Sequence, residues 1–204
     1  MKTGFRFLLI SLFPGFFCLS SAAQEQNPYI LNGNAKQDNC HCYTLTPDLL
    51  TQAGSVWNKN KIDLTRSFDY TFNVYLGCKD AEGADGLVFV LQPIGTSIGS
   101  TGQGLGFEGV QPSVGIPIDT WQNSDFNDPA YDHIGIYKNG DLVNGTANTL
   151  AGPVPVLDNF GNIEDCQWHL FRITWDASSF TLSAEIDGVP RVQTKTDLVK
   201  DIFH

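Results

Sequence analysis

The chain has 204 residues, with 12 basic and 22 acidic side chains and a formal net charge of −10 at neutral pH. This acidic balance argues against nucleic acid and anionic membrane surfaces as binding partners, because both carry negative charge themselves. The length is sufficient for one domain with a sizeable hydrophobic core.

Residues 1–23 have the features of a secretory signal peptide. Two basic residues precede the apolar run Phe7–Leu19, and the small residues at 21–23 offer a cleavage site. A membrane-spanning helix is the weaker interpretation, because the run is short and Pro14 and Gly15 interrupt it. We therefore expect a signal peptide over residues 1–23 and a domain over residues 24–204. No later segment is apolar and long enough to enter a membrane, so a secreted or cell-surface location is expected.

Four cysteines follow the predicted cleavage site, namely Cys40, Cys42, Cys78 and Cys166. An even number of cysteines in a secreted chain predicts disulfide bonds. A Cys40–Cys42 bond is the least favoured, because it would close a strained small ring. The two remaining pairings stay open, and the spacing does not fit a zinc site.

The first half of the domain shows strand patterns rather than helical ones. Apolar side chains alternate along Phe68–Leu76, which predicts a strand with one buried face, and the continuous run Leu87–Leu91 predicts a strand buried on both sides. Residues 99–107 are rich in glycine, and Gly104–Gly109 spells GxGxxG. A dinucleotide site is not expected there, because no strand-turn-helix pattern surrounds the motif.

The segment Pro117–His133 is the most informative of the chain. It places Asp119, Asn123 and Asp128 in an irregular loop between two predicted strands. Side-chain oxygens held in a loop are suited to a hard cation such as calcium, with the backbone carbonyl of Trp121 as a further ligand. The alternative is a solvated acidic turn.

The last third again predicts antiparallel strands. Trp168–Trp175 and Phe180–Ile186 alternate and are joined by a turn at 176–179, and Asp187-Gly188 predicts a second hairpin leading into Val189–Thr194. One short helix is expected over Asp197–Phe203, with Thr196 as its cap. Asn139-Gly140 and Asn144-Gly145 are further turn signals in the middle of the chain. Many strands with glycine and asparagine turns, and no repeat or linker, predict a single all-β sandwich or barrel.

The loop motif resembles the metal-binding loop of the legume-type (L-type) lectins. The family pattern reads acid-x-Asp-Thr-aromatic-x-Asn, then Asp-Pro, then His-Ile-Gly-Ile. Seven residues match it in order and spacing: Asp119, Thr120, Trp121, Asn123, Asp128, Pro129 and His133. The resemblance extends from about Asn32 to Thr194, and the chain is similar to bacterial secreted or surface members of the family. It implies an all-β, concanavalin-like antiparallel β-sandwich of the jelly-roll type.

The resemblance also implies a calcium site and a sugar site. Calcium would be held by Asp119, the Trp121 carbonyl, Asn123 and Asp128. The sugar-binding aspartate would be Asp85 in the sequence Ala-Asp-Gly, after a cis Ala84–Asp85 peptide. Asn123, the amides of the glycine-rich loop at Gly102 and Gly104, and Trp121 would complete the sugar site. The alternatives are a plain turn at Asp85, a flexible hairpin at the glycines and core packing for Trp121.

Two departures from the family pattern carry expectations of their own. The family has a second, transition-metal site that uses an acid where this chain has Pro117, together with the two aspartates and His133. Because Pro117 cannot ligate a metal, we expect one calcium and no transition metal, and His133 is alternatively a hydrogen-bonded structural histidine. The family's closing strand, aromatic-Gly-Phe-Ser/Thr, does not follow Phe203, so we expect the last strand or strands to be missing.

These features predict a non-catalytic, calcium-dependent carbohydrate-binding domain whose partners are glycans or glycoconjugates. A glycoside hydrolase on the same sandwich is the main alternative, but it needs two carboxyl groups flanking the bond, and Glu108, Glu164 and Glu185 are scattered. A structural or adhesive module that binds no sugar is the third interpretation. The sequence predicts neither the preferred sugar nor the oligomeric state, because loop shapes and surface contacts decide both.

Overall fold

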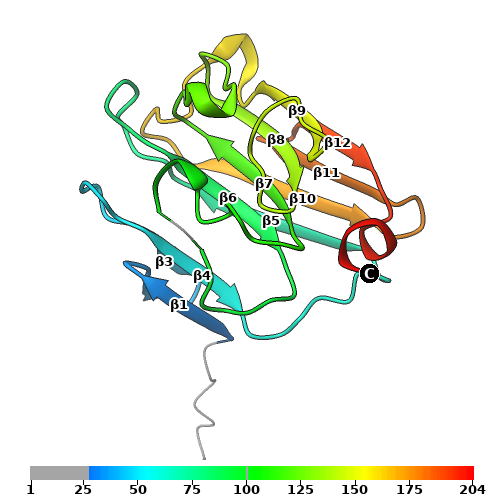
Figure 1. The fold of residues 1–204 in the computed structure, drawn as a ribbon. Helices are drawn as coiled ribbons and strands as arrows, with labels where there is room; N and C mark the ends of the chain where they lie inside the picture. The colour runs from blue at the N-terminus through cyan, green and yellow to red at the C-terminus, as the bar shows by residue number, and fades with distance from the viewer. Residues whose placement is uncertain (1–27, 100) are drawn as a thin grey trace, which may run out of the picture.

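Two four-stranded antiparallel sheets pack face to face in the computed structural model, which describes residues 28–99 and 101–204 (Figure 1). The predicted signal peptide lies outside these residues. The front sheet has the order β6-β7-β8-β9, with β6 Gly86–Leu91, β7 Val114–Asp119, β8 His133–Lys138 and β9 Thr149–Pro155. The back sheet has the order β12-β11-β10-β5, with β12 Val189–Lys195, β11 Thr181–Ile186, β10 His169–Asp176 and β5 Phe68–Val74. The predicted all-β sandwich is confirmed.

Two small two-stranded sheets precede the sandwich along the chain. The first pairs β1 Tyr29–Gly33 with β4 Gly54–Asn58, and the second pairs β2 Lys36–Asn39 with β3 Cys42–Thr44. Short helical turns interrupt the later loops: η1 Gly102–Gly104, η2 Ser124–Phe126, η3 Asp158–Phe160 and η4 Val199–Phe203.

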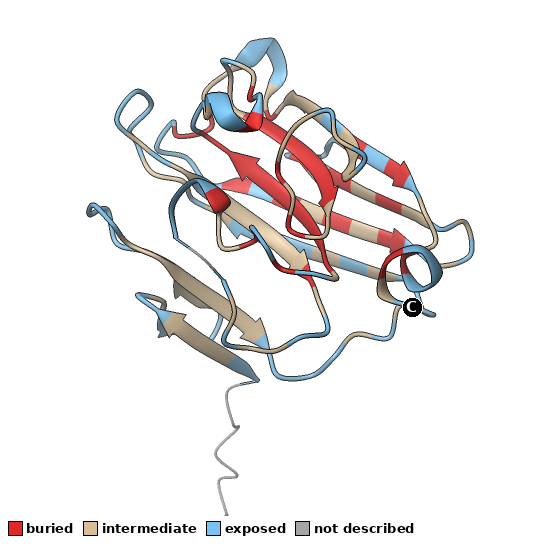
Figure 2. Ribbon diagram, viewed as in Figure 1, coloured by how far each residue is buried: buried red, intermediate tan, exposed pale blue. Residues whose placement is uncertain are grey.

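The core lies between the sheets and is built by alternate residues of each strand. Isoleucines of β7 and β8, such as Ile118 and Ile134, meet Phe171, Ile173 and other inward residues of β10 and β11. A second apolar cluster covers the outer face of the front sheet and consists of Phe107, Phe126, Tyr137 and Leu142. Because both faces of the front sheet are covered, β7 and β8 are buried almost along their whole length (Figure 2). Side chains at the ends of these two strands, such as Asp119 and His133, are therefore buried as well.

The two edge strands on the β5–β6 side are less buried than the sequence predicts. Phe72 of β5 is 41% exposed, although its register partner Phe171 is only 1% exposed. In β6 the residues from Leu87 to Val90 are half-buried rather than fully buried. Each strand ends its four-stranded sheet, so no neighbouring strand covers its outer side.

The hairpin turns follow the prediction. Asp187 and Gly188, between β11 and β12, have φ of 53° and 77°, and Asn139 and Gly140, after β8, have φ of 60° and 66°. Glycine, asparagine and aspartate tolerate this left-handed region, which explains their use at these turns.

The short C-terminal helix starts later than predicted and has a different cap. It is a π-helical turn over Val199–Phe203, and Thr196 makes no capping bond to it. The backbone N–H of Lys200 instead donates to Asp197 Oδ1 at 3.0 Å. Burial of Leu198 and Ile202 against the core fixes this segment, which local sequence signals do not reveal. Within the described part of the chain, no helix is long and apolar enough to cross a membrane.

The disulfide pattern differs from the expected one. Cys78 and Cys166 are bonded, whereas Cys40 and Cys42 are free thiols on the β2–β3 hairpin. Neither of the two pairings that the sequence favoured is present. The reason is the fold, which brings the loops around Cys78 and Cys166 together: the Cys166 N–H donates to the Gly77 carbonyl at 2.9 Å.

Candidate functional site

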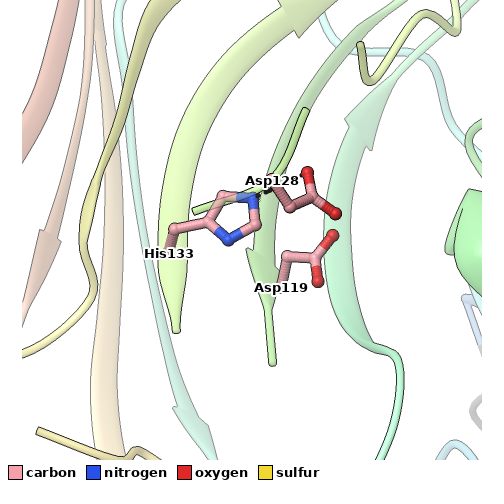
Figure 3. A group of neighbouring side chains, drawn as sticks. All are labelled: Asp119, Asp128 and His133. Carbon is pink, nitrogen blue, oxygen red and sulfur yellow. Dashed lines mark ion pairs between the residues drawn. The ribbon is translucent and has the colours of Figure 1, made fainter. Parts of the chain in front are cut away.

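Two neighbouring strands of the front sheet, with the loop between them, bring together three side chains that could ligate a metal ion. Asp119 ends β7, His133 begins β8 and the two residues are register partners. The loop that joins these strands supplies Asp128, and the three side chains point toward one another (Figure 3). All three are buried, and one ligand atom from each lies within 4.8 Å of the others. This group, with the connecting loop, is called the metal loop (residues 119–133) below.

Backbone amides of the metal loop fold around the two carboxylates. The Trp121 N–H donates to Asp119 Oδ1 at 3.0 Å, and the Asn123 N–H donates to Asp128 Oδ2 at 2.8 Å. The buried side chain of Phe126 anchors the short turn between them. Among the described residues, Asn123 Oδ1 is buried without a hydrogen-bond partner. An orphaned amide oxygen beside two buried carboxylates fits a hard cation with oxygen ligands, such as calcium.

The pKa of Asp119 is raised to about 7, and burial is the largest cause. His133 and the bond from the Trp121 N–H lower this pKa, whereas the carboxylates of Asp128 and Asp85 add to the rise. His133 Nε2 lies 3.5 Å from Asp128 Oδ1. Burying two carboxylates close together is unfavourable unless a positive charge lies beside them. The group is therefore suited to a divalent cation.

Two residues that the sequence did not suggest hold Asp128 in place. Asn144 Nδ2 donates to Asp128 Oδ1 at 2.9 Å, and the Tyr137 hydroxyl donates to Asn144 Oδ1. The Asn144 N–H also donates to the Phe126 carbonyl. The only sequence signal was the Asn144-Gly145 pair, which predicted a turn.

Pro117 lies in the middle of the buried strand β7, two residues before Asp119. The register between β7 and β8 skips Ile116 and Pro117, so the missing N–H of proline falls where that ladder is interrupted. No ligand atom is available at this position, in agreement with the sequence.

The segment Gly83–Gly86 lies beside the metal loop. The Ala84–Asp85 peptide is cis, and the Thr120 N–H donates to the Asp85 carbonyl at 3.1 Å. Gly86 pairs with Asp119 and has φ of 122°, and a Cβ on it would lie 2.1 Å from the Ile118 carbonyl oxygen. Glycine is therefore required after Asp85. The Asp85 side chain is half-buried, and this burial raises its pKa.

Glu164 lies against the same segment, since a Cβ on Gly83 would lie 2.2 Å from its Oε1, and it was not singled out as a site residue. It is 5% exposed, and Thr120 Oγ1 donates to its Oε1 at 3.3 Å. Its Oε2 is buried and has no partner among the described residues. Burial and the carboxylate of Asp132 raise the pKa of Glu164 to about 7; the Thr120 bond lowers it and Asp80 raises it.

The glycine-rich loop reaches the metal loop through Gln103. Asn123 Nδ2 donates to Gln103 Oε1 at 3.2 Å, so Asn123 contacts both loops. Gly102 is exposed and Gly104 is buried, while Trp121 is exposed and does not belong to the core. The GxGxxG stretch forms successive turns and no helix follows it, as the sequence predicted. The predicted sugar-site residues thus come from three loops at one end of the front sheet.

Comparison with known proteins agrees with this architecture. Residues 21–204 match the family of the Legume lectin beta-barrel domain. The pesticidal crystal protein Cry22Aa of Bacillus thuringiensis is 26% identical over 182 residues, covering 78% of this chain and 24% of that protein. Lectin-4 of Griffonia simplicifolia is 41% identical over 81 residues, covering 36% of this chain and 33% of that lectin. The chain thus aligns with about a quarter to a third of the length of these relatives.

A solved structure of a Bauhinia forficata lectin in complex with GalNAc has a TM-score of 0.68 to this chain at 21% identity, covering 87% of this chain and 82% of that one. At this level of identity the similarity establishes the concanavalin-like sandwich fold. Together with the family match over nearly the whole sequence, it identifies the chain as a member of the legume lectin β-barrel (L-type lectin) domain family.

Proposed function

We propose that this domain is a non-catalytic, calcium-dependent carbohydrate-binding module of a secreted or cell-surface protein. The observation that carries the proposal is the double role of Asn123. Its backbone N–H bonds Asp128 and its buried Oδ1 has no partner among the described residues, while its Nδ2 contacts Gln103 of the glycine-rich loop. A cation bound at the metal loop would therefore fix the side chain that links the loops of the sugar site.

Calcium would be held by Asp119, Asp128, Asn123 Oδ1 and the Trp121 carbonyl. When bound, the ion supplies positive charge that offsets the two carboxylates and stiffens the loop. One calcium per chain and no transition metal is expected, because Pro117 offers no ligand atom.

The sugar would be bound by the Asp85 carboxylate, by Asn123 Nδ2 and by the backbone amide of the exposed Gly102. An ionised Asp85 accepts hydrogen bonds from two adjacent sugar hydroxyls, and such charge-assisted bonds are the stronger kind. The exposed Trp121 ring offers an apolar surface for sugar C–H groups. The GalNAc complex of the Bauhinia lectin, which shares the fold, supports a glycan as the ligand class.

The arrangement of acids favours binding over hydrolysis. Asp119 and Asp128 are the paired carboxylates of the site, and both are buried and engaged by backbone amides. Glu164 is buried beneath the Asp85 segment, and Glu185 bonds Arg172 on the back sheet. Two accessible carboxyl groups on either side of a glycosidic bond, which hydrolysis requires, are not formed by these residues.

A glycan array run with calcium and with a chelator tests the proposal. We expect binding only with calcium, no binding by Asp128→Ala, and loss of glycan binding but near-normal calcium affinity for Asp85→Asn. Calcium should also raise the melting temperature of the wild type but not of Asp128→Ala. Glycan binding by the wild type in the presence of the chelator, or glycan binding by Asp85→Asn, would contradict the proposed site.

Elemental analysis of protein purified without added metals tests the metal count. One calcium and no stoichiometric manganese or zinc is the expected result, and His133→Gln should cost only modest stability. One manganese per chain that is lost in His133→Gln would show that a second site forms without the acid at position 117.

The Cys78–Cys166 disulfide supports an oxidising, extracytoplasmic location. Mass spectrometry of the exported protein tests this part of the proposal. The expected product begins after residue 23, and an intact N-terminus on a cytoplasmic product would contradict it.

A further inference from the structure

A pocket of about 330 Å³ lies at the opposite edge of the sandwich from β5 and β6, where β9, η3 and β12 meet. This volume is at the lower end of the range for small-molecule sites. Val154, Leu157 and Pro190 form apolar walls, and Asp158, Phe160 and Arg191 provide its charged and aromatic groups. None of the residues of the metal loop or the Asp85 segment lines it.

Arg191 is the unusual member of this pocket. Its side chain is only 9% exposed, whereas its ion-pair partner Asp158 is 70% exposed. Asp158 Oδ1 accepts a bond from Arg191 Nη1 at 2.8 Å. The Arg191 Nε–H is buried and, among the described residues, finds no acceptor. A buried charged donor without a partner is unfavourable, and an acceptor that entered the pocket would relieve this.

The η3 turn sets an aromatic ring at the rim of the pocket. Asn159 and Phe160 have φ of 57° and 56°, a left-handed conformation that is uncommon for two successive residues other than glycine. Phe160 is 66% exposed, and its ring meets Tyr131 edge-on at 5.0 Å. The backbone conformation thus keeps a large apolar surface in solvent beside a buried guanidinium.

We propose that this pocket binds a carboxylate carried on a six-membered ring. The planar guanidinium of Arg191 is suited to a carboxylate, which can accept from Nε and a terminal nitrogen at once when a small shift of the side chain exposes the buried Nε. The ring would lie against Phe160 and the aliphatic walls, and Asn159 can bond a hydroxyl group. Two sources share this chemistry, a uronic acid of a glycan and an apolar cyclic acid. No residue of the metal loop lines the pocket, so the proposal does not rest on the proposed lectin activity.

Titration of the calcium-loaded protein followed by NMR tests the proposal, with glucuronate, cyclohexanecarboxylate and glucose as probes. We expect at least one of the two acids to shift resonances of residues 154–160 and 190–191, and glucose to leave them in place. Tighter binding of glucuronate identifies an acidic sugar as the ligand, and tighter binding of cyclohexanecarboxylate identifies an apolar acid. Shifts that are equal for glucose and glucuronate, or absent for both acids, overturn the proposal.

Three variants locate the binding energy. Arg191→Lys keeps a positive charge for Asp158 but removes the guanidinium Nε–H. This variant should bind the acid about tenfold more weakly, or weaker still. Asp158→Asn removes the competing carboxylate and should strengthen binding severalfold, and Phe160→Ala should weaken it. Asp85→Asn serves as the control and should leave this titration unchanged. Wild-type affinity in Arg191→Lys, or weaker binding in Asp158→Asn, contradicts the assignment.

Discussion

Asn144 connects the metal loop to the outer face of the front sheet. Its side chain donates to Asp128 and accepts from Tyr137, and its backbone N–H donates to the Phe126 carbonyl. Residues that orient a ligand in this way contribute to metal affinity although they do not touch the ion.

Asn144→Ala is expected to weaken calcium binding by about 10- to 100-fold. The physical reason is that Asp128 loses the bond that fixes its carboxylate. Asn148→Ala is the matched control, since Asn148 lies in the same loop but bonds Asp141 at 2.8 Å instead of Asp128. Isothermal titration calorimetry measures both, and equal calcium affinity for the two variants would contradict the role of Asn144.

Glu164 gives the stability of the domain a pH dependence with a defined sign. Its pKa rises from 4.5 to about 7 on folding, first because of burial. The folded state then holds a proton that the unfolded state has lost, so the free energy of unfolding falls as pH rises from about 4.5 to 7 and is flat above that range.

Glu164→Gln should reduce this slope and be more stable than the wild type at pH 8, by about 1 to 3 kcal/mol. Urea denaturation of calcium-saturated protein at pH 5 and pH 8 measures the effect and keeps the metal ligands occupied. A variant that is less stable than the wild type at pH 8 would show that the carboxylate is ionised and stabilising.

At the scale of elements, the junction between β6 and β7 positions the residues of the proposed sugar site. Gly86 and Asp119 are register partners, so the Asp85 segment and the metal loop leave the sheet side by side. The close approach of Gly86 to the Ile118 carbonyl allows no side chain at this position.

Gly86→Ala is therefore expected to destabilise the fold by about 3 kcal/mol or more and to abolish glycan binding. Gly102→Ala is the matched comparison. Gly102 also has a positive φ, of 75°, but a Cβ there would meet nothing within 4 Å, so the expected cost is only about 1 kcal/mol. Chemical denaturation of both variants measures the difference in their free energies of unfolding. Similar losses of stability would mean that the positive φ, and not the contact with the Ile118 carbonyl, sets the cost of a side chain.

At the scale of the whole molecule, one disulfide encloses the front sheet. Cys78 precedes β6 and Cys166 follows β9, a sequence separation of 88. A bond that closes a long loop lowers the entropy of the unfolded chain and so stabilises the fold.

Replacing both Cys78 and Cys166 by serine should lower the free energy of unfolding by about 2 to 4 kcal/mol. Replacing Cys40 and Cys42 in the same way should have little effect, because both are free thiols on the β2–β3 hairpin. Denaturation under non-reducing conditions checks the pair of variants. A larger loss for the Cys40 and Cys42 variant would indicate that these cysteines are bonded in solution.

Much of the fold and of the metal loop was predictable because both depend on local pattern. Alternation along β5, β10 and β11 predicted strands, and Asp187-Gly188 predicted a hairpin, since a side-chain period and a left-handed turn are properties of neighbouring residues. Asp119, Asn123 and Asp128 in one loop predicted a metal site, and the structure brings Asp119 and Asp128 together with His133, because a loop joining two adjacent strands returns its ends to the same place.

Sequence by itself determined the all-β class, the turn positions and the presence of several possible metal ligands in one short segment. Only the tertiary structure decided which strands lie at sheet edges, that Cys78 pairs with Cys166, and that Glu164 lies under Thr120, 44 residues away. The same is true of Arg191, whose buried Nε depends on the packing of β12 beside β9 and η3. The physical reason is that sequence patterns report interactions between residues close along the chain. Burial and long-range hydrogen bonds arise only when distant segments pack together.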